Sequence, residues 1–430
     1  MIFMSNTKIG PAVKALALGI LSFVLFAPAF GQHYRAPNII VILADDLGVE
    51  SVESYGSEIA TPNLSKLAQN GIQVENAYAM PICSPSRVRL LTGKDSSRNF
   101  QDFGHLGESE QTFARLARDA GYRTLVAGKW QLGDAWEPTI PLTGASPIAA
   151  GFDDYIVHNL TEGEVGSRYW GPTLYRNGRR ERIEDRIYGS DLVNDHLLSF
   201  IDSNRDHPFL IFYSMFEPHD PWVLTPDNTG SRNTQQRYRD MVRYMDKLVG
   251  KVVDKVDSLG LRDNTLIIFT ADNGNHPQIV VNRKGVPHAG GKGTTTRSGT
   301  HVPFIMSWPG RILSGQSSQS LVDIADIAPT IGDLVDRQFE GPLDGVSLMP
   351  LFRNPAQQVR EAIVHNYRPT GRTPVIRYAF NTRYKLYEDG SFFDVTTDET
   401  ETSSLDEKKL DREKRAAREN LKSALQNVGP

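Results

Sequence analysis

The chain of 430 residues contains a single cysteine, Cys83, which opens the run Cys83-Ser84-Pro85-Ser86-Arg87. A lone cysteine cannot form an intramolecular disulfide, so in an exported protein it would stay a free, oxidisable thiol. A buried apolar cysteine is the ordinary alternative, because free cysteines are often buried. A chance match of cysteine, proline, serine and arginine at this spacing is rare, so the run favours a chemical role for Cys83, with Arg87 as a cation beside it.

Two pairs of polar side chains follow strongly apolar runs of the chain. Asp45 and Asp46 come directly after one run, and Asp272 and Asn273 follow a second run of the same kind. Continuous β-branched runs are typical of strands buried on both faces, and ligands of open α/β sheets bind at the carboxyl ends of strands. Either pair alone could be a helix cap or a turn. The two pairs together offer only hard oxygen ligands, and ligands of this type favour Ca²⁺ or Mg²⁺ over zinc.

Basic side chains stand at several glycine- or proline-rich positions. Lys129 follows a glycine, His219 lies in a Pro-His-Asp-Pro segment, and Lys292 lies in a glycine-rich loop. Each could be a solvated surface residue, but with Arg87 they could offset three carboxylates and hold an anion. His219 and Lys292 are candidates to protonate a leaving oxygen. Further side chains near the motifs could contact the substrate or be structural, namely Arg89, His276, His288 and Arg297.

The elements that must position these groups alternate between strands and helices. The pattern predicts strands at residues 38–44, 122–127, 208–213, 265–270 and 302–306, and helices at 61–71, 111–121, 191–204 and 235–260. This alternation predicts an α/β fold in which helices sandwich a large, mostly parallel sheet. Short strands at 383–387 and 391–395 and a charged helix at 406–426 predict a small C-terminal antiparallel-sheet and helix subdomain.

The predicted domains are a signal peptide at residues 1–31, a catalytic α/β domain at 32–340 and the C-terminal subdomain at 341–430. Lys8 and Lys14 lie ahead of the apolar stretch at residues 15–26 and supply its positive charge. Ala29-Phe30-Gly31, after that stretch, fits a cleavage site. That stretch is short for a membrane span, although an uncleaved anchor is the alternative. We therefore expect a periplasmic or secreted protein, with no membrane association after signal cleavage. The net charge of -4 gives no global basic field for nucleic acid.

The order of these groups resembles that of the type I, formylglycine-dependent sulfatase family, whose arylsulfatase-like members have an alkaline-phosphatase-type superfold. Along the chain come two carboxylates, the cysteine motif, a lysine, a histidine, an Asp-Asn pair and a lysine in a glycine-rich loop. Besides the cysteine run, the matching segments are Asn38-Ile39-Ile40, Gly128-Lys129-Trp130-Gln131-Leu132-Gly133, Gly291-Lys292-Gly293-Thr294-Thr295, Lys385-Leu386-Tyr387 and Phe393-Asp394-Val395.

The resemblance implies roles for these residues. A formylglycine-generating maturation enzyme would oxidise Cys83 to an aldehyde, whose hydrate attacks sulfur and releases the alcohol. The remaining hydroxyl is then deprotonated and expels sulfate. The implied metal-binding residues are Asp45, Asp46, Cys83, Asp272 and Asn273, and the implied catalytic residues are Cys83, Arg87, Lys129, His219 and Lys292. The implied substrate is a sulfated small molecule or glycan, with carbohydrate sulfates favoured by family habit and the export signal.

Gln131 departs from the family pattern. Many members carry histidine two residues after the lysine of the Gly-Lys-Trp motif, where this chain has glutamine. Glutamine can hydrogen-bond a hydroxyl group but cannot accept a proton at neutral pH. We therefore expect Gln131 to contact the substrate, and the base that regenerates the aldehyde to be absent, replaced or unnecessary.

Two other functions remain open at this point. A phosphatase or phosphonate monoester hydrolase of the same superfold also uses metals and an alcohol-type nucleophile, but usually two metals and more histidine ligands. The chain has only 10 histidines, which together with the cysteine motif favours sulfate. A non-catalytic relative that keeps the anion site is the second alternative. Gln131 argues mildly for it, and intact Cys83, Arg87 and Lys292 argue against it.

Overall fold

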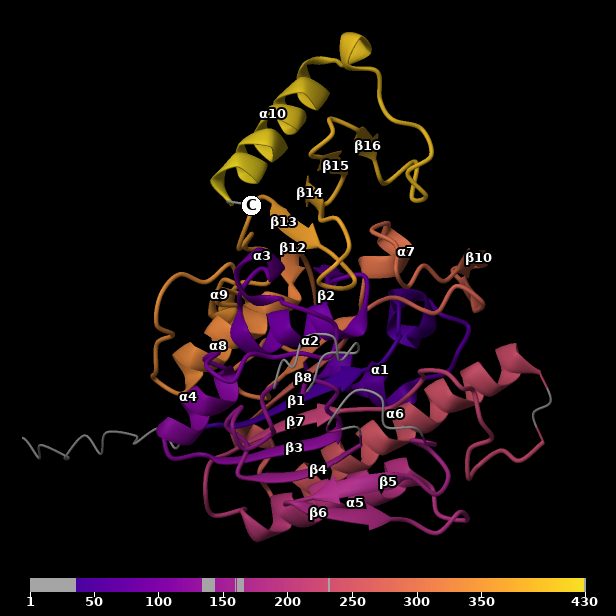
Figure 1. Cartoon of the computed structure of the whole chain (residues 1–430), viewed down its shortest axis with the longest axis vertical. Coiled ribbons are helices and arrows are strands. Elements are labelled where there is room, and N and C mark those ends of the chain that lie inside the picture. The colour runs from indigo at the N-terminus through magenta and orange to yellow at the C-terminus, as the bar shows by residue number, and fades with distance from the viewer. Residues whose placement is uncertain (1–35, 134–143, 159, 161–165, 231–232, 429–430) are drawn as a thin grey trace, which may run out of the picture. The chain divides into compact units, whose positions relative to one another are not determined.

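The protein's structure, a computed structural model, describes residues 36–133, 144–158, 160, 166–230 and 233–428. The predicted signal peptide lies outside these residues. The predicted fold class is confirmed, because a large, mostly parallel sheet is flanked by helices and a small antiparallel sheet lies near the C-terminus (Figure 1). The boundaries at residues 32–340 and 341–430 stay a prediction.

The large sheet has ten strands in the described part of the chain. From edge to edge they are β12 (Gln316–Asp323), β2 (Ile72–Tyr78), β11 (Phe304–Ser307), β8 (Thr265–Ala271), β1 (Asn38–Ala44), β7 (Phe209–Ser214), β3 (Arg123–Lys129), β4 (Asp154–His158), β5 (Thr173–Arg176) and β6 (Arg179–Arg182). Strand β11 runs antiparallel between β2 and β8, and β5 and β6 extend the sheet in antiparallel pairing. The remaining neighbours pair in parallel.

The central strands β1 and β8 bring two chain segments together that are far apart in sequence. They pair in register from Asn38 opposite Thr265 to Ala44 opposite Ala271, and every residue of both strands is buried. Their apolar, β-branched sequences suit this position, because helices cover both faces of the sheet. Since the strands are parallel and in register, the polar residues that follow them emerge side by side.

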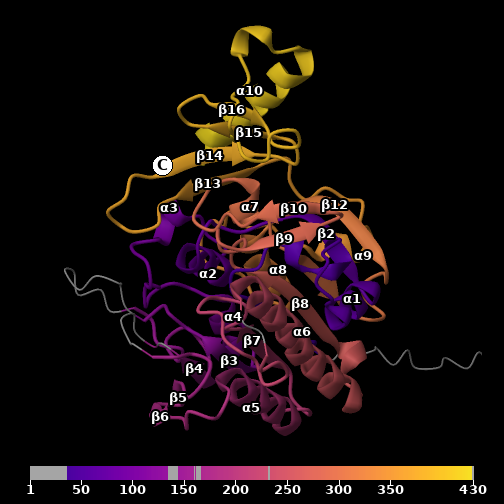
Figure 2. The ribbon, with the colours of Figure 1, turned by 90° about the vertical axis from the view of Figure 1, so that its right-hand side faces the viewer.

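Helices cover both faces of the sheet. Their bounds are α1 (Pro62–Gln69), α2 (Cys83–Thr92), α3 (Ser96–Asn99), α4 (Phe113–Asp119), α5 (Gly189–Ser203), α6 (Thr234–Ser258), α7 (Arg297–Thr300), α8 (Ile327–Leu334) and α9 (Met349–Arg353). Helices α1, α5 and α6 form one packed group and α2, α4 and α8 another, on opposite faces (Figures 1 and 2). Among the described helices, none has both the length and the apolar character that a bilayer crossing needs.

Two smaller sheets complete the fold. A hairpin of β9 (Val280–Arg283) and β10 (Val286–Ala289) precedes the glycine-rich loop. The C-terminal sheet consists of β13 (Ile363–Tyr367), β14 (Ile376–Phe380), β15 (Tyr384–Tyr387) and β16 (Phe392–Asp394), followed by α10 (Arg412–Asn427). Leu421 and Leu425 of α10 pack against this sheet in a small core of their own. The strands and helix predicted from residue 383 onward therefore correspond to β15, β16 and α10.

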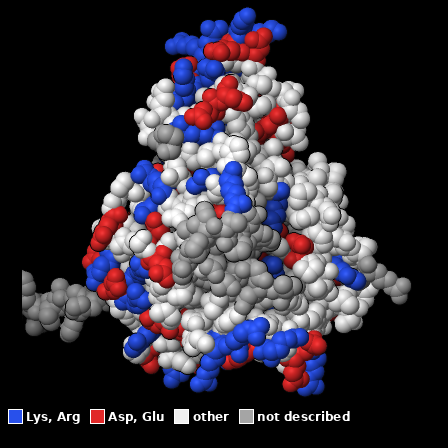
Figure 3. All heavy atoms as spheres, in the orientation of Figure 1, with Lys and Arg blue, Asp and Glu red and all other residues white. Residues whose placement is uncertain are grey.

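Basic side chains are frequent at the lower end of the face in Figure 3, near β5 and β6, with acidic side chains among them. Arg179, Arg180 and Arg182 are exposed on β6, the outermost strand of the large sheet. Charged side chains on an edge strand disfavour pairing with another chain. We therefore assign these arginines a structural role, which is to prevent strand pairing at the edge of the sheet.

A buried ion network ties α2 to the C-terminal sheet. Arg89 pairs with Asp95 at 2.7 Å and with Asp323 at 2.8 Å, and its side chain is 2% exposed. His365 of β13 donates from Nε2 to Asp323 Oδ2 at 2.9 Å. Burial alone would raise the pKa of Asp323, but Arg89 and His365 hold it well below its usual value. The structure thus places Arg89, near the cysteine motif in sequence, in a structural network.

Replacing Arg89 by methionine should destabilise the protein by about 3–5 kcal/mol, because two buried carboxylates lose their cation. Urea unfolding followed by circular dichroism measures the change. Arg186→Met is the matched control, since the Arg186 side chain is 83% exposed. A shift of Arg89→Met no larger than that of the control would contradict a structural role for the network.

Candidate active site

Four oxygen-bearing side chains meet where β1 and β8 end. Asp45 and Asp46 follow β1, Asp272 and Asn273 follow β8, and all four residues are buried. The backbone N–H of Asp46 donates to Asp272 Oδ1 at 3.1 Å, and Asn273 Nδ2 donates to Asp46 Oδ1 at 2.8 Å. The cluster predicted from two separate motifs is therefore one site in space.

Cys83 reaches this cluster from the first residue of α2. Its Sγ lies 3.4 Å from Asp45 Oδ1 and 3.8 Å from Asp46 Oδ1. Burial, together with Asp272, raises the pKa of the Cys83 thiol well above its usual value, although Lys129 and Lys292 oppose the shift. An unmodified Cys83 would therefore be a poor nucleophile at neutral pH, since the thiolate is the reactive form.

Arg87 and Lys129 each hold one carboxylate of the cluster. Arg87 Nη2 donates to Asp272 Oδ2 at 2.8 Å, and Lys129 Nζ lies 2.7 Å from Asp45 Oδ2. Gly128 precedes Lys129 with a φ of 107°, and a Cβ there would meet Ser214 O at 1.9 Å. Glycine is thus required to bring Lys129 into place. Burial raises the pKa of Asp45, but the nearby cations, Lys129 first and then Arg87, hold it well below its usual value, so Asp45 is ionised.

His219 and Lys292 form a proton-bearing pair at the open side of the cluster. Lys292 Nζ lies 2.7 Å from Asp46 Oδ2 and 3.1 Å from His219 Nε2. His219 Nδ1 lies 2.6 Å from the carbonyl oxygen of Asp220, and that contact requires a proton on Nδ1. Burial lowers the pKa of His219 to about 4. The imidazole is therefore neutral, and Nε2 accepts a hydrogen bond from the Lys292 ammonium.

The donor set fits a divalent cation. Asn273 Oδ1 is buried and accepts no hydrogen bond from the described residues, while Nδ2 is held by Asp46 and the carbonyl of Gly274. Ligand atoms of Asp45, Asp46, Cys83 and His219 also lie within 4.8 Å of one another. Burial and the Asp45 carboxylate raise the pKa of Asp272 to about 6, so the ionised form of Asp272 is disfavoured. A bound cation would stabilise that ionised form.

The residues predicted to contact substrate are spread around the site. Gln131 is buried at the end of β3, with a φ of 55°. His276 packs edge-on against Trp222 with ring centroids 5.2 Å apart. His288 Nδ1 is 3.8 Å from Glu399 Oε2 in the C-terminal region. The Arg297 guanidinium is 5.9 Å from the centre of the Tyr78 ring on β2.

The sequence analysis did not identify three residues of the site. Ser214 donates to Lys129 O at 2.6 Å and also accepts from Arg87, and the carbonyl of Glu217 accepts from Asp45 N at 3.0 Å. Ser214 is the last residue of β7, and Glu217 comes shortly after it. Because β7 ends at the same sheet edge as β1, its end was a usable signal. Arg168 Nη1 lies 3.5 Å from Asp45 Oδ2. No motif surrounds Arg168, so the sequence contains no comparable signal for it.

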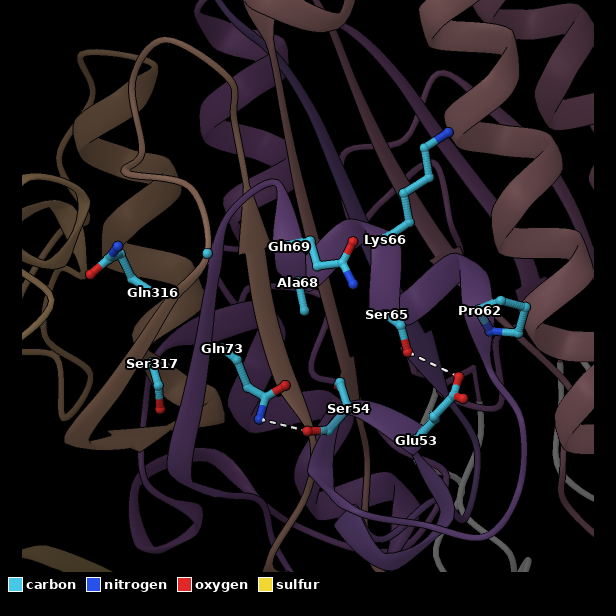
Figure 4. Close-up of a pocket in the computed structure, with 11 residues that line it drawn as sticks. Glu53, Ser54, Pro62, Ser65, Lys66, Ala68, Gln69, Gln73, Gln316 and Ser317 are labelled. Carbon is cyan, nitrogen blue, oxygen red and sulfur yellow. Dashed lines mark hydrogen bonds between the residues drawn. The ribbon is translucent and has the colours of Figure 1, made fainter.

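A separate hollow of about 610 Å³ lies away from this chemistry. Figure 4 shows its polar lining, in which Gln73 donates to Ser54 O at 3.2 Å and Ser65 to Glu53 at 3.1 Å. It includes Gln316, the first residue of β12, and lies next to the start of β2. Cys83 and the carboxylates follow the opposite, carboxyl ends of the parallel strands. The hollow is therefore distinct from the candidate active site.

Comparison with known protein families identifies the class of the chain. Residues 37–337 match the sulfatase family, and residues 294–428 match the C-terminal region of N-sulphoglucosamine sulphohydrolase. The first match spans most of the chain and includes every element of the cluster. The chain belongs to the sulfatase family and is a sulfuric ester hydrolase.

Individual relatives act on different sulfates. The chain is 28% identical to mouse steryl-sulfatase over 83% of its own length and 72% of that protein. It is 30% identical to human N-acetylgalactosamine-6-sulfatase over 74% of its length and 66% of that protein. A protein solved with its substrate D-glucosamine-2-N,6-O-disulfate has the same fold, with a TM-score of 0.74, 19% identity, and coverage of 92% of this chain and 99% of that one.

Asp272→Asn should lose the bound divalent ion, because the variant removes a carboxylate charge from a fully buried donor set. We expect calorimetric titration with Ca²⁺ to show one site in the wild type and at least about a tenfold loss of affinity in the variant. Asp227→Asn is the control, because Asp227 is exposed and pairs with Lys247. Stoichiometric zinc in place of calcium, or unchanged affinity in Asp272→Asn, would contradict the assigned ligands.

Proposed function

We propose that the protein hydrolyses a sulfate ester of a carbohydrate with a formylglycine nucleophile made from Cys83. The observation that carries the proposal is the position of Cys83 Sγ, 3.4 Å and 3.8 Å from two carboxylates at the strand ends and surrounded by buried cations. An anionic ester can approach such a site only if cations offset the carboxylates. Lys129, Lys292 and Arg87 supply that charge.

Each residue of the site has a separate role in the proposed reaction. Formylglycine would supply the hydroxyl that attacks sulfur, and a Ca²⁺ ion, or Mg²⁺, held by Asp45, Asp46, Asp272 and Asn273 would polarise a sulfate oxygen. Arg87 and Ser214 hold Asp272 and the end of β3 in place. The Lys292 ammonium lies at the open side of the cluster and can donate a proton to the leaving oxygen. His219 Nε2 lies beside Lys292 Nζ and can relay a proton between Lys292 and the substrate.

The carbohydrate assignment is supported by relatives and by the rim of the site. One relative is named for N-acetylgalactosamine 6-sulfate, and one structural neighbour was solved with a disulfated glucosamine. Trp222 follows His219 by three residues, packs against His276 and donates from its indole to Pro218 O at 3.1 Å. An aromatic ring held in this way can pack against the apolar face of a sugar. Gln131 is proposed to hydrogen-bond a substrate hydroxyl.

Export to the periplasm or the exterior is also part of the proposal. The basic and apolar segment at residues 1–31 motivates it, and an extracellular polysaccharide would be met there. Phosphate or phosphonate ester hydrolysis is the second candidate, because the same cations would bind those anions. The donor set here contains three carboxylates and one amide, which suits a single hard cation better than a two-metal centre.

Protein purified from a host that has the maturation enzyme should contain formylglycine at position 83. Peptide mass spectrometry should show the aldehyde or its hydrate, and Cys83→Ala should abolish hydrolysis of 4-nitrophenyl sulfate and of sugar sulfates. Ser86→Ala is the control inside the motif, because Ser86 bonds to the backbone of Met80 rather than to the cluster. Full sulfatase activity with an unmodified thiol would refute the proposed nucleophile, and faster turnover of phosphonate esters would favour the second candidate.

Gln131 should make sulfate release the slow step. A missing general base slows a proton-dependent step by about 10²–10⁴-fold. We therefore expect a burst of alcohol release before a slower steady state in stopped-flow traces, and faster steady-state turnover for Gln131→His near pH 7. Gln131→Glu separates a proton-accepting role from shape alone. The absence of a burst, with Gln131→His no faster than the wild type, would show that another group already acts as the base.

A further inference from the structure

Arg168 is a cation of the active site that belongs to none of its sequence motifs. Its side chain is 17% exposed, as is that of Lys292, whereas the side chains of Arg87 and Lys129 are 1% and 3% exposed. Among these four cations, Arg168 and Lys292 are therefore the two that reach the open side of the cluster. A side chain in that position can touch the substrate.

The other three cations already match the three carboxylates one to one. Arg87 lies 2.8 Å from Asp272, Lys129 lies 2.7 Å from Asp45, and Lys292 lies 2.7 Å from Asp46. Arg168 is farther away, because its Nη1 lies 3.5 Å from an Asp45 oxygen that Lys129 already binds. Arg168 is thus a surplus positive charge, and a divalent cation bound by Asp45 would increase that surplus.

The backbone around Arg168 is anchored to the loop that carries His219. Tyr169 is fully buried, and its hydroxyl oxygen lies 2.8 Å from Phe216 O and 2.5 Å from His219 O, so its one proton is shared between these two carbonyls. Gly189 N donates to Tyr169 O, and a Cβ on Gly189 would lie 2.6 Å from Arg168 O. These contacts fix the start of the Arg168 side chain relative to His219. The planar guanidinium is itself preorganised, so it loses less conformational entropy for each hydrogen bond that it forms with an anion.

We propose that Arg168 binds a second negatively charged group of the substrate, a carboxylate or another sulfate next to the ester that is cleaved. This inference rests on the sulfatase function proposed above and adds that the preferred substrate carries two anionic groups. With a divalent ion bound, that ion and the four cations would supply six positive charges against three carboxylates, so the one negative charge of a sulfate monoester would leave an excess. The planar guanidinium can also form two parallel hydrogen bonds to a carboxylate or a sulfate.

Charge balance for Asp45 is the competing role of Arg168. In that role Arg168 would affect every substrate alike, because Asp45 belongs to the catalytic cluster. Recognition of a second anion instead affects only substrates that carry one. A comparison of singly and doubly charged ligands therefore separates the two roles.

The experiment measures ligand binding in the Cys83→Ala background, where turnover cannot interfere. Calorimetry compares N-acetyl-D-glucosamine 6-sulfate with D-glucosamine-2-N,6-O-disulfate and with a uronate-linked disaccharide of N-acetyl-D-glucosamine that carries a single 6-sulfate. The second and third ligands supply the second anion as a sulfate and as a carboxylate, respectively. Arg168→Gln and Arg168→Lys are tested in the same background, and Arg179→Gln is the control on an exposed arginine.

We expect one of the doubly anionic ligands to bind at least about tenfold more tightly than the monosulfate, as one charge-assisted hydrogen bond provides. Arg168→Gln should remove that preference, Arg168→Lys should keep part of it, and Arg179→Gln should leave it unchanged. Equal affinity for all three ligands would overturn the inference. So would an Arg168→Gln variant that weakens all ligands by the same factor, because that result indicates charge balance.

Kinetics of the matured enzyme separates this inference from the proposed function. Arg168→Gln should raise KM for the doubly anionic substrate by about tenfold more than it raises KM for 4-nitrophenyl sulfate. Equal losses on both substrates would overturn the inference while leaving the sulfatase function intact. A matured wild type that hydrolyses no sulfate ester would refute the function, whereas the binding comparison would still decide the role of Arg168.

Discussion

The structure depends on keeping three carboxylates together in a buried place. Asp45, Asp46 and Asp272 are fully buried, and their mutual repulsion would protonate or separate them without nearby cations. Lys129, Lys292 and Arg87 each hold one carboxylate at 2.7–2.8 Å. The same cations leave the cluster able to accept an anionic ester beside a metal ion. Charge pairing therefore links the stability of the site to its chemistry.

The fold supplies this pairing through strand ends and one helix. Strands β1 and β8 present the carboxylates, β3 presents Lys129, and α2 carries both Cys83 and Arg87 on its first turns. Arg87 binds Asp272, and Arg89 binds Asp323 of β12, which also accepts a hydrogen bond from His365 of β13. Helix α2 is therefore fixed to the catalytic edge and, through Asp323, to the C-terminal sheet. The C-terminal sheet thus contributes to the position of Cys83 without lying in the cluster.

Much of this architecture could be predicted from sequence, for identifiable physical reasons. Buried parallel strands need continuous apolar runs, so β1, β7 and β8 were visible, as were the polar pairs after β1 and β8. The antiparallel insertion of β11 and the outer strands β5 and β6 were not, because pairing direction is set by tertiary contacts. Arg168 was invisible because a lone arginine in a loop has no pattern. Arg89 was ambiguous, since only the fold reveals its partners Asp95 and Asp323.

The central claim is that residue 83 attacks sulfur within this cluster, and trapping of the intermediate tests it most directly. In Cys83→Ser the attacking group keeps one hydroxyl but lacks the second hydroxyl needed to expel sulfate. Incubation with 4-nitrophenyl sulfate should release at most one equivalent of alcohol and leave a sulfate ester at position 83, detected by peptide mass spectrometry. Multiple turnovers without an adduct at that position would contradict the account.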